Sequence, residues 1–311
     1  MDPKAPFYGD VAEAPEGELC VWLRTADAVR VRAAHWRGGD KGTVLLFPGR
    51  TEYIEKYGPA AGEFAARGYS MAVIDWRGQG IADRLLADEA PGHVVDFGDY
   101  QKDIAVFVDW LKREEMPEPW YLVAHSMGGC IGLRALHEQL PVRAAVFSAP
   151  MWGIKMQVAL LPLAWTLGTL APMFGLGGRL APSTSRETYV AITPFEGNLL
   201  TRDRPMFEFM QRQTAAHPEL AIGGPSLQWV GQALLETRAL AAMPSPDFPC
   251  LTALGLAERV VQIDAIKQRM ANWPGSEFDL VEEAEHELMM EKPPIRKRFY
   301  DRAARFFDKN R

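Results

Sequence analysis

Continuous apolar runs that each end in a turn restrict the fold of this chain more than any other feature. The runs do not alternate between apolar and polar residues, which indicates strands that are buried on both faces, as in a parallel sheet. Helical stretches separate them, and a strand–helix alternation predicts an α/β fold with helices on both faces of a mostly parallel sheet. Two earlier strand-like segments, 19–24 and 28–36, are expected to form a hairpin. The runs are 43–47, 70–74, 120–124, 144–147, 250–254 and 278–281.

The alternation stops between residues 150 and 249, a stretch rich in Pro, Gly, Met and aromatic residues that is typical of helices and loops. Since the strand pattern resumes afterwards, we interpret this stretch as a helical cap inserted over the carboxyl edge of the sheet. Ligands bind at that edge in open α/β sheets. The expected organisation is a core domain of residues 1–149 and 250–311 with a cap at 150–249; a separate helical domain is the alternative.

Charge and cysteine content exclude several classes of function. The net charge of −6 and the scattered Lys and Arg residues argue against nucleic-acid binding and against a polybasic membrane anchor. Three cysteines without a C-x-x-C pair indicate neither a disulfide framework nor a zinc site. There is no phosphate loop of the G-x-x-x-x-G-K-[ST] type, so we expect no cofactor and no metal.

Two segments bear on targeting. Residues 1–17 lack the apolar region of a secretory signal. Residues 156–176 are mostly apolar, but two prolines and two glycines interrupt them, and a membrane span needs about 20 uninterrupted apolar residues. We therefore expect a soluble, cytoplasmic protein.

The segment around Ser126 carries the strongest chemical signal. Ala124-His125-Ser126-Met127-Gly128 follows an apolar strand and precedes a helical stretch, with small residues two positions before and after the serine. This is the pattern of a nucleophile elbow, in which a strained turn exposes a serine hydroxyl. Ala124 stands where glycine is usual, and alanine is small enough to fit. The pattern predicts Ser126 as a nucleophile; an ordinary structural serine is the alternative.

A nucleophilic serine needs a histidine base and an acid that orients it. In folds with such an elbow, the acid and then the histidine follow the serine along the chain. Of the six histidines, His286 is the one that follows the last strand and precedes the last helix. Glu258, four residues after the strand at 250–254, is the preferred acid. Asp264 is the alternative and is better explained as a helix N-cap.

Oxyanion donors are expected from two backbone N–H groups. One is that of Met127, directly after the nucleophile, and the other lies in a loop after an early strand. That loop is Phe47-Pro48-Gly49-Arg50, and Gly49 permits a close backbone approach. Arg50 is therefore the second predicted donor.

Several blocks of the sequence resemble the monoglyceride lipase and bacterial lysophospholipase branch of the α/β hydrolases, and the resemblance spans residues 18 to 308. The family's usual pattern differs at four positions: Pro48 stands in place of His, Ala82 of Ser, Ala124 of Gly, and Glu258 of Asp. The resemblance implies an α/β-hydrolase fold with Ser126, Glu258 and His286 as its triad. The blocks are 47–52 with 54–57, 75–80, 124–129, 194–198, 218–225, 255–261 and 285–287.

The resemblance and the apolar cap together point to a carboxylic ester of a lipid as substrate, such as a lysophospholipid or a monoacylglycerol. Large apolar residues gather between Trp152 and Phe174, where they are expected to line an acyl-chain channel or to touch a membrane surface transiently. Two alternatives stay open. One is a carboxylesterase, lactonase or peptidase acting on a small substrate, and the other is a ligand-binding homologue without catalysis.

Overall fold

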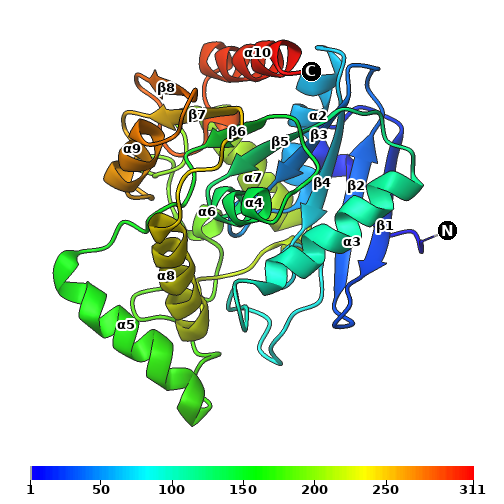
Figure 1. Cartoon of the computed structure of the whole chain (residues 1–311). Helices are drawn as coiled ribbons and strands as arrows, with labels where there is room; N and C mark the ends of the chain where they lie inside the picture. Colours follow the sequence, from blue (N-terminus) through cyan, green and yellow to red (C-terminus); the bar gives the residue numbers. More distant parts are fainter. Residues whose placement is uncertain (1) are drawn as a thin grey trace.

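The computed structural model describes residues 2–311, and one eight-stranded sheet forms its centre (Figure 1). The strands follow the order β1-β2-β4-β3-β5-β6-β7-β8, with β2 antiparallel to both neighbours and all later pairs parallel. The predicted α/β class and the predicted hairpin are confirmed. The strands are β1 Glu18–Arg24, β2 Arg30–Trp36, β3 Thr43–Phe47, β4 Ser70–Asp75, β5 Trp120–His125, β6 Ala145–Ser148, β7 Cys250–Gly255 and β8 Glu277–Val281.

Helices cover both faces of the sheet, as the unalternating apolar runs predict. Val44 and Leu46 of β3 pack with α2 and α10, whereas Leu45 and Phe47 of the same strand pack with α3, α4 and α9 on the other face. The helices of the core are α2 Gly58–Ala65, α3 Asp99–Arg113, α4 Met127–His137, α9 Ile263–Ala271 and α10 Pro293–Lys309, with a short α1 Gly9–Ala12 near the N-terminus. Short 3-10 helices occur at η1 Ile54–Tyr57 and η5 Leu288–Met290.

The chain between β6 and β7 contributes no strand to the sheet. Helix α5 extends away from the sheet, and α8 lies beside it (Figure 1). The two helices approach closely at glycines, since a Cβ on Gly168 would lie 2.5 Å from the Cα of Gly231. The division into core and cap at residues 150 and 249 stays a prediction. The helices here are η2 Val158–Leu160, α5 Leu161–Leu170, η3 Ala171–Phe174, α6 Tyr189–Ile192, α7 Arg204–Ala216, η4 Pro218–Leu220 and α8 Leu227–Ala242.

The register of the parallel strands brings four chain segments to one edge of the sheet. Phe47 of β3 pairs with Ala124 of β5, so the turn after β3 lies beside the elbow after β5. Ser148 pairs with both His125 and Ala253, which places the ends of β5, β6 and β7 level. The end of β8 continues this edge through the pairing of Gly255 with Val281.

A fully buried ion network connects the antiparallel part of the sheet to the loop that follows β3. Arg32 on β2 donates to both oxygens of Glu55 and to Oδ2 of Asp75, each at 2.7 Å, and all three side chains are 0–1% exposed. Asp75 Oδ1 also accepts the backbone N–H of Ile54 at 2.9 Å. The network therefore holds η1, and with it the chain that follows β3.

Replacing Arg32 with methionine tests the energetic role of this network. The change keeps the apolar volume but leaves two buried carboxylates without a cation, so we expect the free energy of unfolding to fall by about 3–5 kcal/mol in urea titrations. Arg30→Met on the same strand is the matched control. Arg30 pairs with Asp83 at the surface, where side chains are 43% and 37% exposed, and such pairs contribute about 0–1 kcal/mol. Equal losses for both variants would contradict the prediction.

Candidate active site

Ser126 lies on the turn between β5 and α4 in a strained conformation. Its φ of 49° and ψ of −116° fall outside the regions that non-glycine residues favour, a strain of about 1–3 kcal/mol. Its backbone N–H donates to Ser148 O at 3.1 Å, and its carbonyl oxygen accepts the N–H groups of Gly129 and Met151. These bonds compensate for the strain and hold the serine in place.

Close packing explains the small residue two positions after the serine. A Cβ on Gly128 would lie 2.1 Å from the carbonyl oxygen of Phe47 at the end of β3. The glycine thus permits the start of α4 to approach the turn that contains Arg50. Ala124, at the other small position, is completely buried within β5 and is accommodated there.

His286 and Glu258 form a buried hydrogen-bonded pair. His286 lies in the loop between β8 and η5, and Nδ1 is 2.7 Å from Oε2 of Glu258, which follows β7. The other carboxylate oxygen accepts the backbone N–H of Val261 at 3.0 Å and that of Val260. Burial opposes ionisation of Glu258, but the bond from His286 and the backbone N–H groups outweigh it and lower the pKa of the carboxyl.

The two carboxylate oxygens of Glu258, the predicted acid, have different partners. Oε1 accepts the backbone N–H of Val261 in the same loop, and Oε2 forms the hydrogen bond with Nδ1 of His286. Asp264 lies elsewhere, in the first turn of α9. Its prediction as an N-cap is wrong: the N-cap residue is Gln262, so the helix begins one residue before Asp264 rather than after it.

The predicted oxyanion donors lie on the two turns that the sheet register brings together. Met127 is the first residue of α4, a position whose N–H has no partner within the helix. Arg50 lies in the turn after β3, and no described residue accepts its backbone N–H. Arg50, Ser126, Met127 and His286 all line one cavity of about 290 Å³.

Residues of the segment between β6 and β7 complete this cavity. The wall is largely apolar, which suits an organic ligand with a hydrocarbon part. The apolar residues from this segment include Met151, Ile154, Val190, Leu200, Met210 and Trp229.

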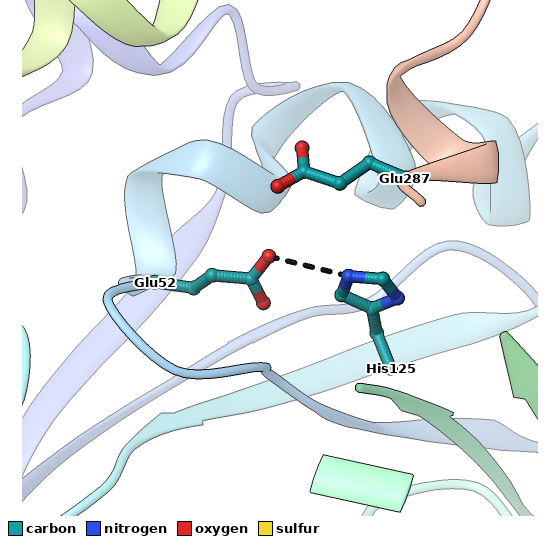
Figure 2. A group of neighbouring side chains, drawn as sticks. All are labelled: Glu52, His125 and Glu287. Carbon is teal, nitrogen blue, oxygen red and sulfur yellow. Dashed lines mark ion pairs between the residues drawn. The ribbon is translucent and has the colours of Figure 1, made fainter. Parts of the chain in front are cut away.

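A buried charge cluster that the sequence analysis did not predict lies beside His286. Figure 2 shows Glu52, His125 and Glu287 gathered together, with Nε2 of His125 3.7 Å from Oε1 of Glu52. Their ligand atoms lie within 4.8 Å of one another, close enough to hold a metal ion. However, Nζ of Lys56 contacts Glu52 at 2.7 Å and Glu287 at 2.8 Å, so an ammonium group already compensates both carboxylates.

The cluster links the turn after β3, which contains Gly49 and Arg50, to the loop of His286. Glu52 accepts the backbone N–H of Gly49 and, at 2.6 Å, the hydroxyl of Tyr57, while Glu287 follows His286 directly. Burial opposes ionisation of Glu52, yet Lys56 and His125 outweigh it and lower its pKa to about 2. The polar residues Arg50, Thr51 and Glu52 follow β3 after Pro48 and Gly49, but they carry no signal of the partners that Glu52 meets.

Of the five other histidines, His125 lies beside His286, with the ring centres 4.7 Å apart. Burial lowers the pKa of His125 to about 4, and its Nδ1 faces Ser148 O at 3.0 Å, so this imidazole is neutral at pH 7. The others are His35 on β2, His93 in a loop, His137 at the end of α4 and His217 after α7.

Comparison with known proteins identifies the family of this chain. Residues 38–293 match the family model described as serine aminopeptidase, S33 (Hydrolase_4). The chain belongs to this family. It is 34% identical over 285 residues to lysophospholipase L2 of Escherichia coli K12, covering 86% of this chain and 79% of that protein. It is also 26% identical over 256 residues to a probable lysophospholipase L2 of Haemophilus influenzae, covering 82% and 80% of the two chains.

The solved structures agree on the fold. A soluble variant of monoglyceride lipase from Saccharomyces cerevisiae, in complex with a substrate analogue, superposes with a TM-score of 0.71 at 17% identity, over 93% of this chain and 94% of that one. The resemblance to the lysophospholipase and monoglyceride lipase branch of the α/β hydrolases is therefore confirmed, and the chain is a hydrolase of this fold.

Two carboxylate substitutions distinguish the acids. In Glu258→Gln the imidazole loses its anionic partner, and we expect kcat for an ester substrate to fall by at least about 100-fold while the protein stays folded. Asp264→Asn changes a helix-terminal carboxylate and should alter kcat less than about threefold. Steady-state kinetics with a chromogenic ester measures both, and a larger loss in Asp264→Asn would overturn the choice of acid.

Proposed function

We propose that Ser126, Glu258 and His286 form a catalytic triad that cleaves carboxylic esters of lipids through an acyl-enzyme on Ser126. The proposal is supported above all by the strained turn that presents Ser126 to the same cavity as the paired His286. The chain is a hydrolase that acts on ester bonds of lipid-like substrates. Its similarity to proteins named lysophospholipase and monoglyceride lipase supports this.

The hydrogen bond between His286 and Glu258 sets the direction of proton transfer. An ionised carboxylate only accepts, so Nδ1 of His286 carries the proton and Nε2 is left to accept one. Nε2 takes the proton of Ser126 as Oγ attacks the ester carbonyl carbon. The backbone N–H groups of Arg50 and Met127 stabilise the resulting oxyanion. His286 then gives the proton to the departing alcohol, and a water activated by His286 releases the fatty acid.

The apolar wall of the cavity favours an acyl chain, and the names of the relatives favour a lysophospholipid or a monoacylglycerol as the substrate. The same machinery would also cleave small esters, lactones or peptides, because the triad acts on any acyl carbon that reaches it. A ligand-binding protein without catalysis would gain nothing from a strained serine beside a paired histidine.

Parallel assays of the wild type and Ser126→Ala test this proposal. We expect the wild type to release fatty acid from lysophosphatidylethanolamine or monoacylglycerol, and the loss of the nucleophile to reduce kcat by about 10⁴-fold or more. A fluorophosphonate probe should label the wild type and not the variant. Cys130→Ser, a change of a buried residue on α4, is the folding control. Preferred cleavage of short esters or peptides would support the alternative substrates, and absence of labelling in folded wild type would refute catalysis.

We further propose that the protein is cytoplasmic and contacts the inner face of the membrane transiently through the cap. All three cysteines are buried and unpaired, as is usual in a reducing compartment. No helix among residues 2–311 is long and apolar enough to cross a bilayer. Large apolar side chains are nevertheless exposed on α5 and η3, with Met173 at 75% and Phe174 at 74%.

Vesicle binding tests this contact. In the double variant Met173→Ser/Phe174→Ser, we expect co-sedimentation with phosphatidylethanolamine–phosphatidylglycerol vesicles to fall severalfold. The reason is that less apolar surface enters the membrane interface. Activity on a water-soluble ester should not change. Leu280→Ser is the control, since it removes an exposed apolar side chain from β8, a strand drawn well away from α5 in Figure 1. Equal binding by all three proteins would refute the proposal.

A further inference from the structure

Arg50 lines the cavity that contains Ser126, and its side chain has no carboxylate partner among residues 2–311. Its Nη1 donates to the carbonyl oxygen of Gly223 at 2.9 Å, and its guanidinium carbon is 5.6 Å from the ring centre of Trp229. Among residues 2–311, no Asp or Glu oxygen lies within 4.0 Å of the guanidinium. Most of its five N–H donors are therefore not used by another residue.

Three buried cations of this protein face carboxylates, whereas the buried Arg269 bonds to Ser245 and to backbone carbonyl oxygens. Arg32 pairs with Glu55 and Asp75, Lys56 with Glu52 and Glu287, and Arg77 with Asp27 and Asp103. Arg50 has no carboxylate beside it either, but it is partly exposed and its unpartnered nitrogens are not enclosed, so these donors are open to a ligand. Burial lowers the pKa of Arg50 to about 10, and only the nearby Tyr100 opposes this shift, so the group is still a cation at pH 7.

We propose that the guanidinium of Arg50 binds the phosphate of the substrate, and that the protein therefore selects lysophospholipids over monoacylglycerols. The proposal rests on the function proposed above, which it narrows to one substrate class. Arginine presents a planar set of donors that matches phosphate oxygens and forms charge-assisted hydrogen bonds with them.

The position of Arg50 suits the shape of a lysophospholipid. Its backbone N–H is the proposed donor to the ester oxyanion, and its side chain extends from there towards Gly223 and Gly92. The glycerol unit separates the ester carbon from phosphorus by a span similar to the length of an arginine side chain. One residue can thus contact the reacting carbonyl through its main chain and the phosphate through its side chain.

A fatty-acid carboxylate is the other anion that the reaction could supply. However, this carboxylate forms at Ser126, where the backbone N–H groups of Arg50 and Met127 meet it, and not at the far end of the Arg50 side chain. The phosphate lies in the alcohol part of the ester, on the opposite side of the scissile bond. We therefore assign the guanidinium to the phosphate.

Arg50→Gln separates the side chain from the main-chain donor, because the backbone N–H is kept. The test compares kcat/KM for lysophosphatidylethanolamine with that for a monoacylglycerol of the same chain length. We expect the ratio to fall by about 10- to 100-fold, the effect of losing a charged hydrogen bond. KM should account for most of the change, because the phosphate is remote from the reacting atoms and is bound equally before and during the reaction. Arg50→Lys, which keeps the charge, should restore part of the ratio.

Arg84→Gln is the matched control. Arg84 also bonds only to backbone carbonyl oxygens, those of Glu219 and Ala221, but it lines a neighbouring cavity without Ser126. The ratio of the two kcat/KM values in Arg84→Gln should equal that of the wild type. An unchanged ratio in Arg50→Gln, or an equal fall in Arg84→Gln, would overturn the inference.

A second measurement does not depend on the folding of a variant. Glycerol 3-phosphate should inhibit the wild type competitively at concentrations at least tenfold below those at which glycerol does, and equal inhibition would overturn the inference. If fatty acid inhibited Arg50→Gln more weakly than the wild type, and the ratio of the two kcat/KM values were unchanged, the Arg50 guanidinium would be assigned to the fatty-acid carboxylate instead. These failures differ from failure of the proposed function, in which the wild type would cleave neither lipid or Ser126→Ala would keep its activity.

Discussion

The structure depends on the level carboxyl ends of the parallel strands. Because β3, β5, β7 and β8 end at the same edge, the turn of Arg50, the elbow of Ser126 and the loops of Glu258 and His286 meet although they are far apart in sequence. The contact is close enough that Gly128 cannot carry a Cβ. The sheet thus fixes the relative positions of these loops, as the proposed nucleophile and its base would require.

Buried charges then hold the loops that leave this edge. The Arg32 network binds Glu55 in the segment after β3. The cluster of Glu52, Lys56 and Glu287 joins the same segment to the loop of His286. Each carboxylate in these networks has a cation or backbone N–H groups as partners, which makes such burial tolerable. Arg50 differs from the groups in these networks, because no described carboxylate lies within 4.0 Å of its guanidinium.

The candidate site could be predicted in part because its residues follow strand ends. Ser126 is predicted by its local pattern, and His286 by its place between the last strand and the last helix. The cluster around Glu52 was missed because nothing local shows that its partner Glu287, far along the chain, lies beside it. Helix α9 was assigned a wrong N-cap, because Asp264 has the composition of a cap while the helix begins earlier.

The sequence by itself determined the layers of the fold, since strands without alternation must be buried on both faces and the helices between them must cover those faces. It also predicted Ser126 and His286 as candidate site residues. Only the tertiary structure decided between Glu258 and Asp264 as the partner of His286, and only it showed that Arg50 has no carboxylate beside it. Both depend on distances between loops, which follow from strand register and packing and leave no periodic trace in the chain.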